Sequence, residues 1–219
     1  MGASSGFPID LVLFGMIAAF LVLRLRSVLG RRQGFERPAA PPAEPARAPA
    51  AGPVILGQAE PVAGTAPDPA SPQGQALAAM QRIDRNFTPQ HFLDGAQAAF
   101  RLIVGAYAAG DRAALSGLLS EETLRAFEGA IAAREAAGET QRTEIRAIAT
   151  AAIEQAALQG SAAQIGVRFV SDQVNLTLGR DGTPVAGTDA VTEITDHWTF
   201  ERDLAAADPT WRLVAARSA

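Results

Sequence analysis

The sequence predicts an α+β fold, in which helices pack on one face of a curved antiparallel sheet, preceded by a transmembrane helix and a disordered linker. Three observations support this prediction. Apolar residues recur at helical spacing from residue 75 to Gly138, and the spacing then changes to two. Ten of the 14 prolines lie between Pro38 and Pro72. Residues 11–23 carry no charge, and four arginines follow within nine residues.

Residues 11–23 form the centre of a predicted membrane anchor. A helix over residues 9–29 would be about 31 Å long, close to the thickness of the hydrocarbon core of a bilayer. A secretory signal is excluded because its positive residues precede the apolar run, whereas here they follow it. A buried core helix is the alternative, but the proline-rich segment that follows cannot cover one. The anchor and its basic flank comprise Leu11, Phe14, Met16, Phe20, Leu23, Arg24, Arg26, Arg31 and Arg32.

The position of the arginines predicts the orientation of the anchor. Basic residues favour the cytoplasmic side, so the first residues are expected outside and the C-terminal domain in the cytoplasm. Arg31 and Arg32 would then meet the anionic headgroups of membrane lipids. All 19 basic residues are Arg and Ala is abundant, which is typical of a GC-rich bacterial genome. We therefore expect a single-pass protein of a bacterial inner membrane.

Residues 33–74 form the predicted linker. Their Pro and Ala content, with few aromatic residues, is typical of a disordered or polyproline-rich tether. One apolar run, Val54-Ile55-Leu56, interrupts it and is either a short partner-binding motif or a chance cluster. The predicted organisation is therefore an anchor at residues 1–32, a linker at 33–74 and one folded domain at 75–219.

Helices are predicted over the first part of the folded domain. A short amphipathic helix begins near residue 75 and suits either the membrane surface or a place capping the domain. The next helix starts at the N-cap Thr88 with Pro89 in its first turn, and it ends at Gly110. Its apolar stripe comprises Phe92, Ala96, Ala99, Phe100, Ile103 and Tyr107. Asp111 caps a short third helix, and Ser120 caps a fourth that ends at Gly138.

Strands are predicted after Gly138. The first covers residues 140–158 and is bent or broken, and the second continues to residue 178 with a change of phase at residues 171–173, as a β-bulge would cause. Residues 179–187, with Asp181-Gly182, read as a hairpin loop. Two further strands cover residues 190–204 and 211–216. Helices followed by a curved antiparallel sheet indicate an α+β domain with a pocket on the concave side of the sheet.

The composition excludes several kinds of chemistry. The absence of Cys excludes disulfides and thiolate nucleophiles, and the absence of Lys excludes Schiff-base chemistry. Two His are too few for a His-rich metal site, and a net charge of −4 does not suit a nucleic-acid-binding protein. No phosphate-binding loop or nucleophile elbow is present. We therefore expect no cofactor, no metal and no enzymatic activity.

Asp196 is the one candidate for acid–base chemistry. Its strand alternates so that Asp196 shares a face with Ile194, Trp198 and Phe200, which predicts a carboxylate inside the domain. A buried Asp near Tyr107 could act as a general base with an oxyanion donor. The favoured alternative is that Asp196 pairs with Arg168 or Arg202, or lies at an edge of the sheet.

Several segments together resemble the bacterial TimA branch of the Tim44-like (Tim forty-four) domain family. They are the anchor with its proline-rich tether, "FTPQHFLDGAQAAFRLIVGAYAAGDRAALSGLLS" at residues 87–120 and "ITDHWTFERDLAAADPTWRLVA" at residues 194–215. These bacterial proteins are relatives of the peripheral inner-membrane scaffold of the mitochondrial protein-import motor. The positions that match the family pattern are Phe92, Phe100, Asp111, Leu118, Leu119, Asp196, Trp198, Phe200, Arg202 and Trp211.

The resemblance implies an α+β domain of the nuclear-transport-factor-two or cystatin-like type with an apolar pocket. It also implies a non-enzymatic adaptor that tethers a chaperone or translocase component at the membrane, with lipids and a protein as its partners. An anchor and tether stand where the mitochondrial scaffold has its chaperone-engaging region. The alternative is a module that binds a small ligand or lipid, or an isomerase-type enzyme using Asp196. The expected pocket and core residues are Phe92, Phe100, Ile103, Tyr107, Asp196, Trp198, Phe200 and Trp211.

Overall fold

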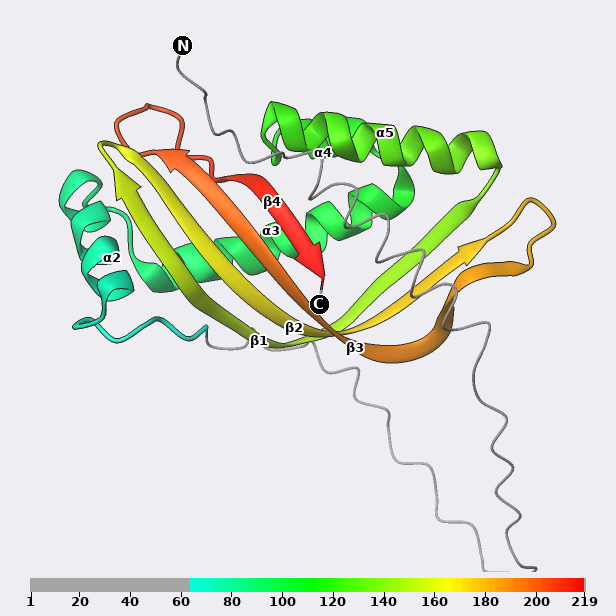
Figure 1. Cartoon of the computed structure of the whole chain (residues 1–219), viewed down its shortest axis with the longest axis horizontal. Coiled ribbons are helices and arrows are strands. Elements are labelled where there is room, and N and C mark those ends of the chain that lie inside the picture. The colour runs from blue at the N-terminus through cyan, green and yellow to red at the C-terminus, as the bar shows by residue number, and fades with distance from the viewer. Residues whose placement is uncertain (1–63, 219) are drawn as a thin grey trace, which may run out of the picture. The chain divides into compact units, whose positions relative to one another are not determined.

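The computed structural model describes residues 64–218. Its helices are α2 (Pro72–Ile83), α3 (Pro89–Ala109), α4 (Arg112–Ser116) and α5 (Glu121–Ala137). Its strands are β1 (Thr140–Gln159), β2 (Ala162–Leu178), β3 (Pro184–Asp203) and β4 (Arg212–Ser218). They pair antiparallel in the order β1-β2-β3-β4, which confirms the predicted α+β class (Figure 1).

The predicted membrane anchor and most of the predicted linker lie outside the described residues. Within residues 64–218, no helix combines the length and the apolar character that crossing a membrane requires.

The helix boundaries follow from local capping signals. The side chains of Thr88, Asp111 and Ser120 each accept a hydrogen bond from a backbone N–H three residues later, as N-caps do. Gly110 and Gly138 end α3 and α5 with φ of 72° and 71°, a conformation that costs a residue with a Cβ about 1 kcal/mol or more. All these caps were predicted from the sequence, because each signal spans only a few residues.

The first helix of the domain, α2, packs against β1. Its N-cap Ser71 accepts a hydrogen bond from the N–H of Gly74, and its apolar side chains Leu77 and Met80 are buried. Because this apolar face is covered by the domain, the structure favours the capping interpretation of α2. Ile83 is the exception, since 44% of it stays exposed.

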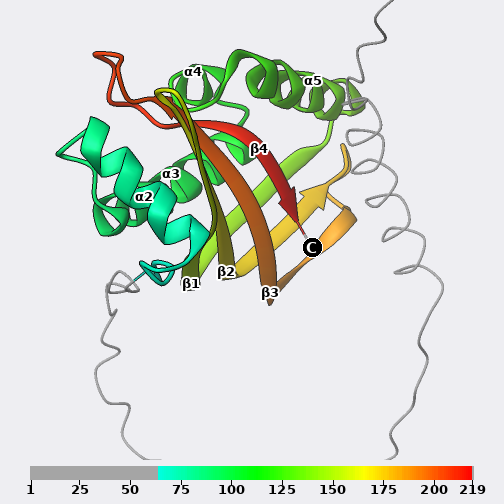
Figure 2. The same cartoon turned by 60° about the vertical axis from the view of Figure 1, so that its left-hand side comes forward.

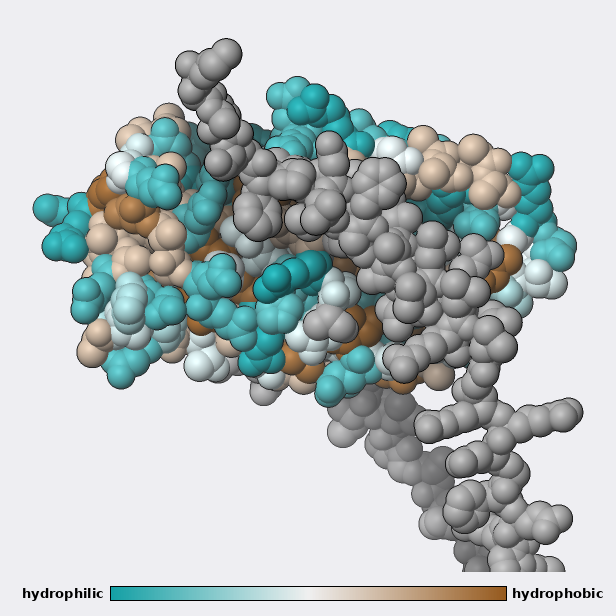
Figure 3. All heavy atoms as spheres, in the orientation of Figure 1, coloured by the Kyte–Doolittle hydropathy of each residue, from teal (hydrophilic) through white to brown (hydrophobic). Residues whose placement is uncertain are grey.

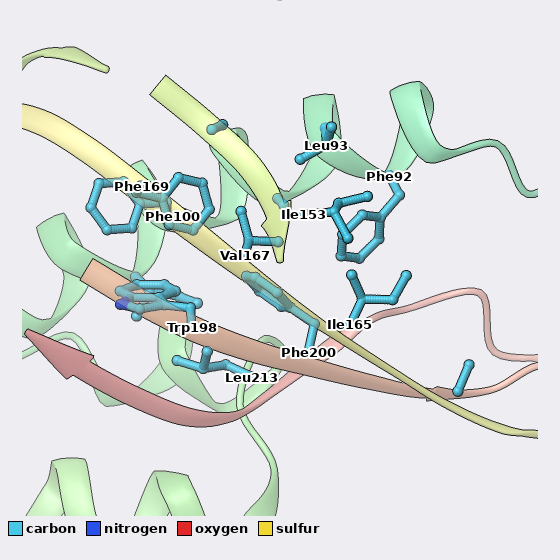
Figure 4. Close-up of a cluster of buried hydrophobic side chains, with 14 of the residues drawn as sticks. Phe92, Leu93, Phe100, Ile153, Ile165, Val167, Phe169, Trp198, Phe200 and Leu213 are labelled. Carbon is cyan, nitrogen blue, oxygen red and sulfur yellow. The ribbon is translucent and has the colours of Figure 1, made fainter. Parts of the chain in front are cut away.

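The sheet curves around α3, which runs along its concave side, and both views show this arrangement (Figures 1 and 2). The centre of the core lies between α3 and the middle of the sheet. Phe100 of α3 stacks on Phe169 of β2 with ring centroids 4.5 Å apart, and Trp198 of β3 meets Phe100 edge-on at 4.7 Å (Figure 4). Such aromatic pairs contribute about 0.5–1.5 kcal/mol each beyond the area they bury.

One strand boundary differs from the sequence prediction: β3 begins at Pro184 instead of residue 190, because the chain turns within residues 179–183 and pairs again at once. The change of phase that was predicted around residues 171–173 of β2 is confirmed, since Gln173 and Val174 are both buried and the pairing with β3 shifts register between Gln173 and Asn175. The buried alternation continues through Ser171 and Gln173 because these polar side chains bond to one another inside the domain. Strand β1 accommodates the curvature with three shifts of register.

Both outer strands form hydrogen bonds with segments outside the sheet. On β1, the N–H of Thr65 donates to the carbonyl of Ala151 (2.9 Å), and Thr65 accepts from the N–H of Ile153 (3.1 Å). On β4, Leu213 donates to the carbonyl of Leu118 (2.8 Å). The second contact fixes Leu118 beside β4 and next to the start of α3, where the candidate site lies.

Candidate functional site

A cleft of about 500 Å³ opens between the first turns of α3 and the connection from β3 to β4. This volume lies within the range of ~300–1,000 Å³ that is typical of ligand sites. The lining residues are Asp84, Asn86, Phe87, Thr88, His91, Phe92, Gly95, Ala96, Ala99, Leu118, Phe200, Arg202, Ala207, Pro209 and Trp211. At the end of the domain that carries α2, the face drawn in Figure 3 shows hydrophobic residues grouped among hydrophilic ones.

The apolar wall of the cleft is a group of four aromatic rings. Phe87 precedes the N-cap of α3 and packs on Phe92 in its first turn, with centroids 6.3 Å apart, as a hydrophobic staple does. Trp211 meets Phe92 edge-on at 4.8 Å, and Phe200 closes the group from β3. The three Phe side chains are at most 5% exposed, whereas Trp211 is half-buried. Trp211 therefore offers the accessible aromatic surface of the cleft.

The polar end of the cleft is an ion pair between two segments that are distant in sequence. Nη1 of Arg202 donates to Oδ2 of Asp84 at 2.9 Å, and the two side chains are 13% and 15% exposed. The backbone N–H of Asn86 donates to the other oxygen of Asp84, also at 2.9 Å. The hydrogen bond from Asn86, together with Arg202, lowers the pKa of Asp84 below its ordinary value. This pair joins the loop before α3 to the end of β3.

One atom of this ion pair has no acceptor. Nε of Arg202 is buried and finds no hydrogen-bond partner within residues 64–218. A guanidinium has five N–H donors, and a buried donor without a partner costs about 1–3 kcal/mol. This donor is covered by the protein, so it does not belong to the accessible surface of the cleft.

Asp196 lies in a second polar cluster, away from the cleft. It is 7% exposed, and its carboxylate accepts hydrogen bonds from Oγ of Ser218 at 2.5 Å and from Nε2 of Gln173 at 3.2 Å. Burial raises the pKa of Asp196, and the hydrogen bonds from Ser218 and Gln173 oppose that rise.

Neither arginine that was considered as a partner of Asp196 takes that role. Arg168 lies opposite His197, so its side chain is on the other face of the sheet from Asp196, where it pairs with Glu154 at 2.6 Å. Arg202 pairs with Asp84. The expected ion pair with one of these arginines is thus wrong, because two other carboxylates lie closer to the guanidinium groups.

The pocket and core residues that were predicted from the sequence lie in different parts of the domain. Phe92, Phe200 and Trp211 line the cleft. Phe100, Ile103 and Trp198 lie in the core. Tyr107 packs edge-on against Phe127 at 5.2 Å, with the guanidinium of Arg134 5.1 Å from its ring centroid. Neither Asp196 nor Tyr107 is among the residues that line the cleft, so the cleft does not bring a general base and an oxyanion donor together.

Sequence reasoning missed the polar residues of the cleft. Asp84, Asn86 and His91 carry no recognisable motif, and the ion pair of Asp84 joins residues 118 positions apart. The N-cap at Thr88 was recognised, but only as the start of a helix. Within residues 64–218 there is no group of three or more His, Asp or Glu residues that could hold a metal ion.

The whole cleft lies inside a span that matches a known family. The model of the Tim44-like domain matches residues 73–218, from α2 to the end of β4. The chain belongs to the Tim44-like family. Both the cleft and the Asp196 cluster are therefore parts of the Tim44-like domain, and the family resemblance inferred from the sequence is confirmed.

One solved structure shares the overall fold of the Tim44-like domain only at a low level. The crystal structure of the intermembrane space region of the chloroplast protein ARC6 is similar to it, with 9% sequence identity and a TM-score of 0.43. This similarity covers 57% of the present chain and 94% of that chain, and at this level it carries no functional information. No curated protein matches the chain.

Proposed function

We propose that this protein is a membrane-anchored, non-enzymatic adaptor of a bacterial inner membrane. The apolar helix around residues 11–23 anchors it with the N-terminus outside, and Arg31 and Arg32 contact lipid headgroups on the cytoplasmic side. The proline-rich linker then lets the Tim44-like domain hold a protein partner near the membrane surface. The partner class is a chaperone or a translocase component, as the family suggests.

The observation that carries this proposal is the open, aromatic-lined cleft in a domain of this family. Trp residues are enriched among the few side chains that dominate the energy of protein interfaces. Trp211 is half-buried at the cleft, where it can contact a partner without rearrangement of the core. A domain that presents such a surface on a flexible tether gains effective concentration for partners at the same membrane.

A second candidate function is a module that binds a small ligand or a lipid, and the volume of the cleft favours it. An isomerase-type enzyme using Asp196 has less support. Asp196 has a raised pKa and no cationic partner, as that mechanism would require, but it does not line the cleft. Its carboxylate oxygens are instead bonded to Ser218 and Gln173.

Photo-crosslinking in cells tests the adaptor proposal. A photoreactive residue is placed at exposed positions of the full-length protein, and crosslinked material is identified by mass spectrometry. A linker-deleted variant serves as the control. We expect a chaperone or translocase component to be enriched with the full-length protein and lost when the linker is deleted. Crosslinks to lipid alone, or no enrichment over the control, would reject the adaptor proposal.

A further inference from the structure

We propose that the convex face of the sheet binds a second copy of this chain, so that two Tim44-like domains pack face to face across β2 and β3. This face is the side of the sheet opposite to α3 and to the cleft. The pairing of two copies goes beyond the proposed adaptor function and does not depend on it.

The convex face is uncovered within residues 64–218. Strand β2 alternates between buried residues and partly exposed ones, because only its buried residues point toward the helices. Helix α3 runs along the concave side and α2 packs against β1 (Figures 1 and 2). The convex residues of β2 and β3 are therefore free to contact another molecule.

The middle of the convex face is small and uncharged. In the register of the sheet, Val170 of β2 lies between Thr150 of β1 and Thr195 of β3. All three side chains are half-buried. Short side chains of this kind let two sheets approach to the ~10 Å at which packed sheets lie face to face.

One side of this middle row is acidic. Asp172 of β2 and Glu193 of β3 are direct neighbours in the register, and like charges in that position destabilise a sheet. Neither carboxylate forms an ion pair or a side-chain hydrogen bond with a residue of the described part of the chain. A cation from outside these residues would relieve their repulsion.

The other side of the middle row is basic. Arg168, His197 and Arg217 form a line across β2, β3 and β4. Arg217 is exposed and has no ion pair within residues 64–218. Arg168 is 32% exposed and uses Nε for its ion pair with Glu154, so further guanidinium donors remain accessible.

The acidic and basic sides match each other under a two-fold axis. An axis that crosses the strands at Val170 and Thr195 places the acidic side of one copy over the basic side of the other. Asp172 then faces Arg168 of the second copy, and Glu193 lies within reach of Arg217 of that copy. A two-fold interface makes each contact twice. A partner of a single charge would match only one of the two sides, whereas a second copy matches both.

Chemical crosslinking at the axis tests this arrangement. The chain has no Cys, so one introduced Cys reports on one position. Because packed sheets lie about 10 Å apart, a short bis-maleimide bridges two thiols where a direct disulfide would not reach. We expect Val170→Cys and Thr195→Cys of the full-length protein in detergent micelles to give crosslinked dimers on a denaturing gel. Leu102→Cys, at a position that is 60% exposed on α3, is the matched control and should stay monomeric.

An exchange of charges tests the complementarity. Glu193→Arg and Arg217→Glu each place like charges across the interface, and each is expected to raise the Kd of the dimer at least tenfold, as measured by sedimentation equilibrium of the full-length protein. The double variant restores opposite charges and should recover most of the affinity. Within one chain the two positions are separated by four residues along the strands, roughly 13 Å, so this recovery would not arise from a pair inside one copy.

The same charge changes on another surface are the control. Glu122→Arg and Arg125→Glu lie at exposed positions of α5 and are expected to leave the Kd of the dimer unchanged. The inference is overturned if the Cys variants at positions 170 and 195 crosslink no more than Leu102→Cys. It is also overturned if the double charge variant dimerises no better than the two single variants, because the association would then use another surface.

Discussion

Asp84 at the cleft and Asp196 in the sheet are both little exposed, yet the protein shifts their pKa values in opposite directions. Asp84 is bound by a backbone N–H and by Arg202, and its pKa is lowered. Asp196 is bound by the neutral groups of Ser218 and Gln173, and burial raises its pKa. The two carboxylates behave differently because the N–H of Asn86, together with Arg202, stabilises the charge of Asp84, whereas at Asp196 the cost of desolvation outweighs the hydrogen bonds.

The difference also separates two roles. The Asp196 cluster is closed, since its donors and acceptors bond to one another between β2, β3 and β4. The ion pair of Asp84 and Arg202 lies at the lining of the cleft, and the buried Nε of Arg202 has no acceptor within residues 64–218. The Asp196 cluster therefore specifies the packing of three strands, whereas the ion pair joins the loop before α3 to the end of β3.

The largest effect is expected for Asp196→Ala. This change removes the acceptor of Ser218 and one of the two acceptors of the buried Gln173, and it creates a small cavity. The free energy of unfolding should fall by about 1–3 kcal/mol. Urea denaturation of the full-length protein in detergent, followed through the fluorescence of the nearby Trp198, measures it. An unchanged midpoint would show that the cluster does not stabilise the sheet.

Asp84→Asn is expected to have a smaller effect and to lower the free energy of unfolding by about 1 kcal/mol at neutral pH, because the ion pair is partly exposed. The folded state lowers the pKa of Asp84 from 3.8, so its carboxylate stabilises the protein above that value. This stabilisation is lost as the pH falls through the lowered pKa. The difference in stability between the parent protein and Asp84→Asn should therefore shrink below pH 4. Denaturation curves of both proteins across the acidic range measure this difference.

Asp196→Asn is expected to show the opposite pH dependence, and it should change the free energy of unfolding by less than about 1 kcal/mol. An amide can donate to Ser218 and accept from Gln173, so the hydrogen bonds persist without a buried charge. Because the folded state raises the pKa of Asp196, the parent protein is destabilised at neutral pH relative to its protonated form.

The difference between Asp196→Asn and the parent protein should be greatest above the raised pKa. It should disappear as the pH falls to the ordinary value of 3.8, where Asp196 is protonated in the parent as well. A difference that grows on acidification would contradict the assignment of burial as the dominant cause. Asp172→Asn, at a half-buried position on the neighbouring strand, is a suitable control.

The smallest effect on stability is expected for Arg202→Lys. The ammonium group can still pair with Asp84, so the free energy of unfolding should change by no more than about 0.5–1 kcal/mol. Thermal denaturation compared with Arg168→Lys measures it. Near-normal stability would show that a positive charge is enough to hold Asp84 and that the guanidinium geometry is not needed. A large loss of stability would instead make Arg202 chiefly structural.

Local signals made most of the fold predictable. The caps at Thr88, Asp111 and Ser120 and the terminating glycines depend on residues within one turn of each other. The alternation around Asp196 correctly gave its inward orientation, because the period of a strand is a property of the sequence itself. The phase change of β2 near Gln173 was also predicted, because the parity of the apolar residues reverses there. The sequence did not show that the polar Ser171 and Gln173 bond to one another inside the domain.

The sequence by itself therefore determined the α+β class, the helix ends and the family. Only the tertiary structure decided the cleft, the pairing of Asp84 with Arg202 and the neutral partners of Asp196. These contacts join residues from distant parts of the chain, and they depend on the curvature of the sheet and on three register shifts in β1. Local propensities act over a few residues, whereas such pairings are settled by how the layers pack, and no short pattern in the sequence encodes them.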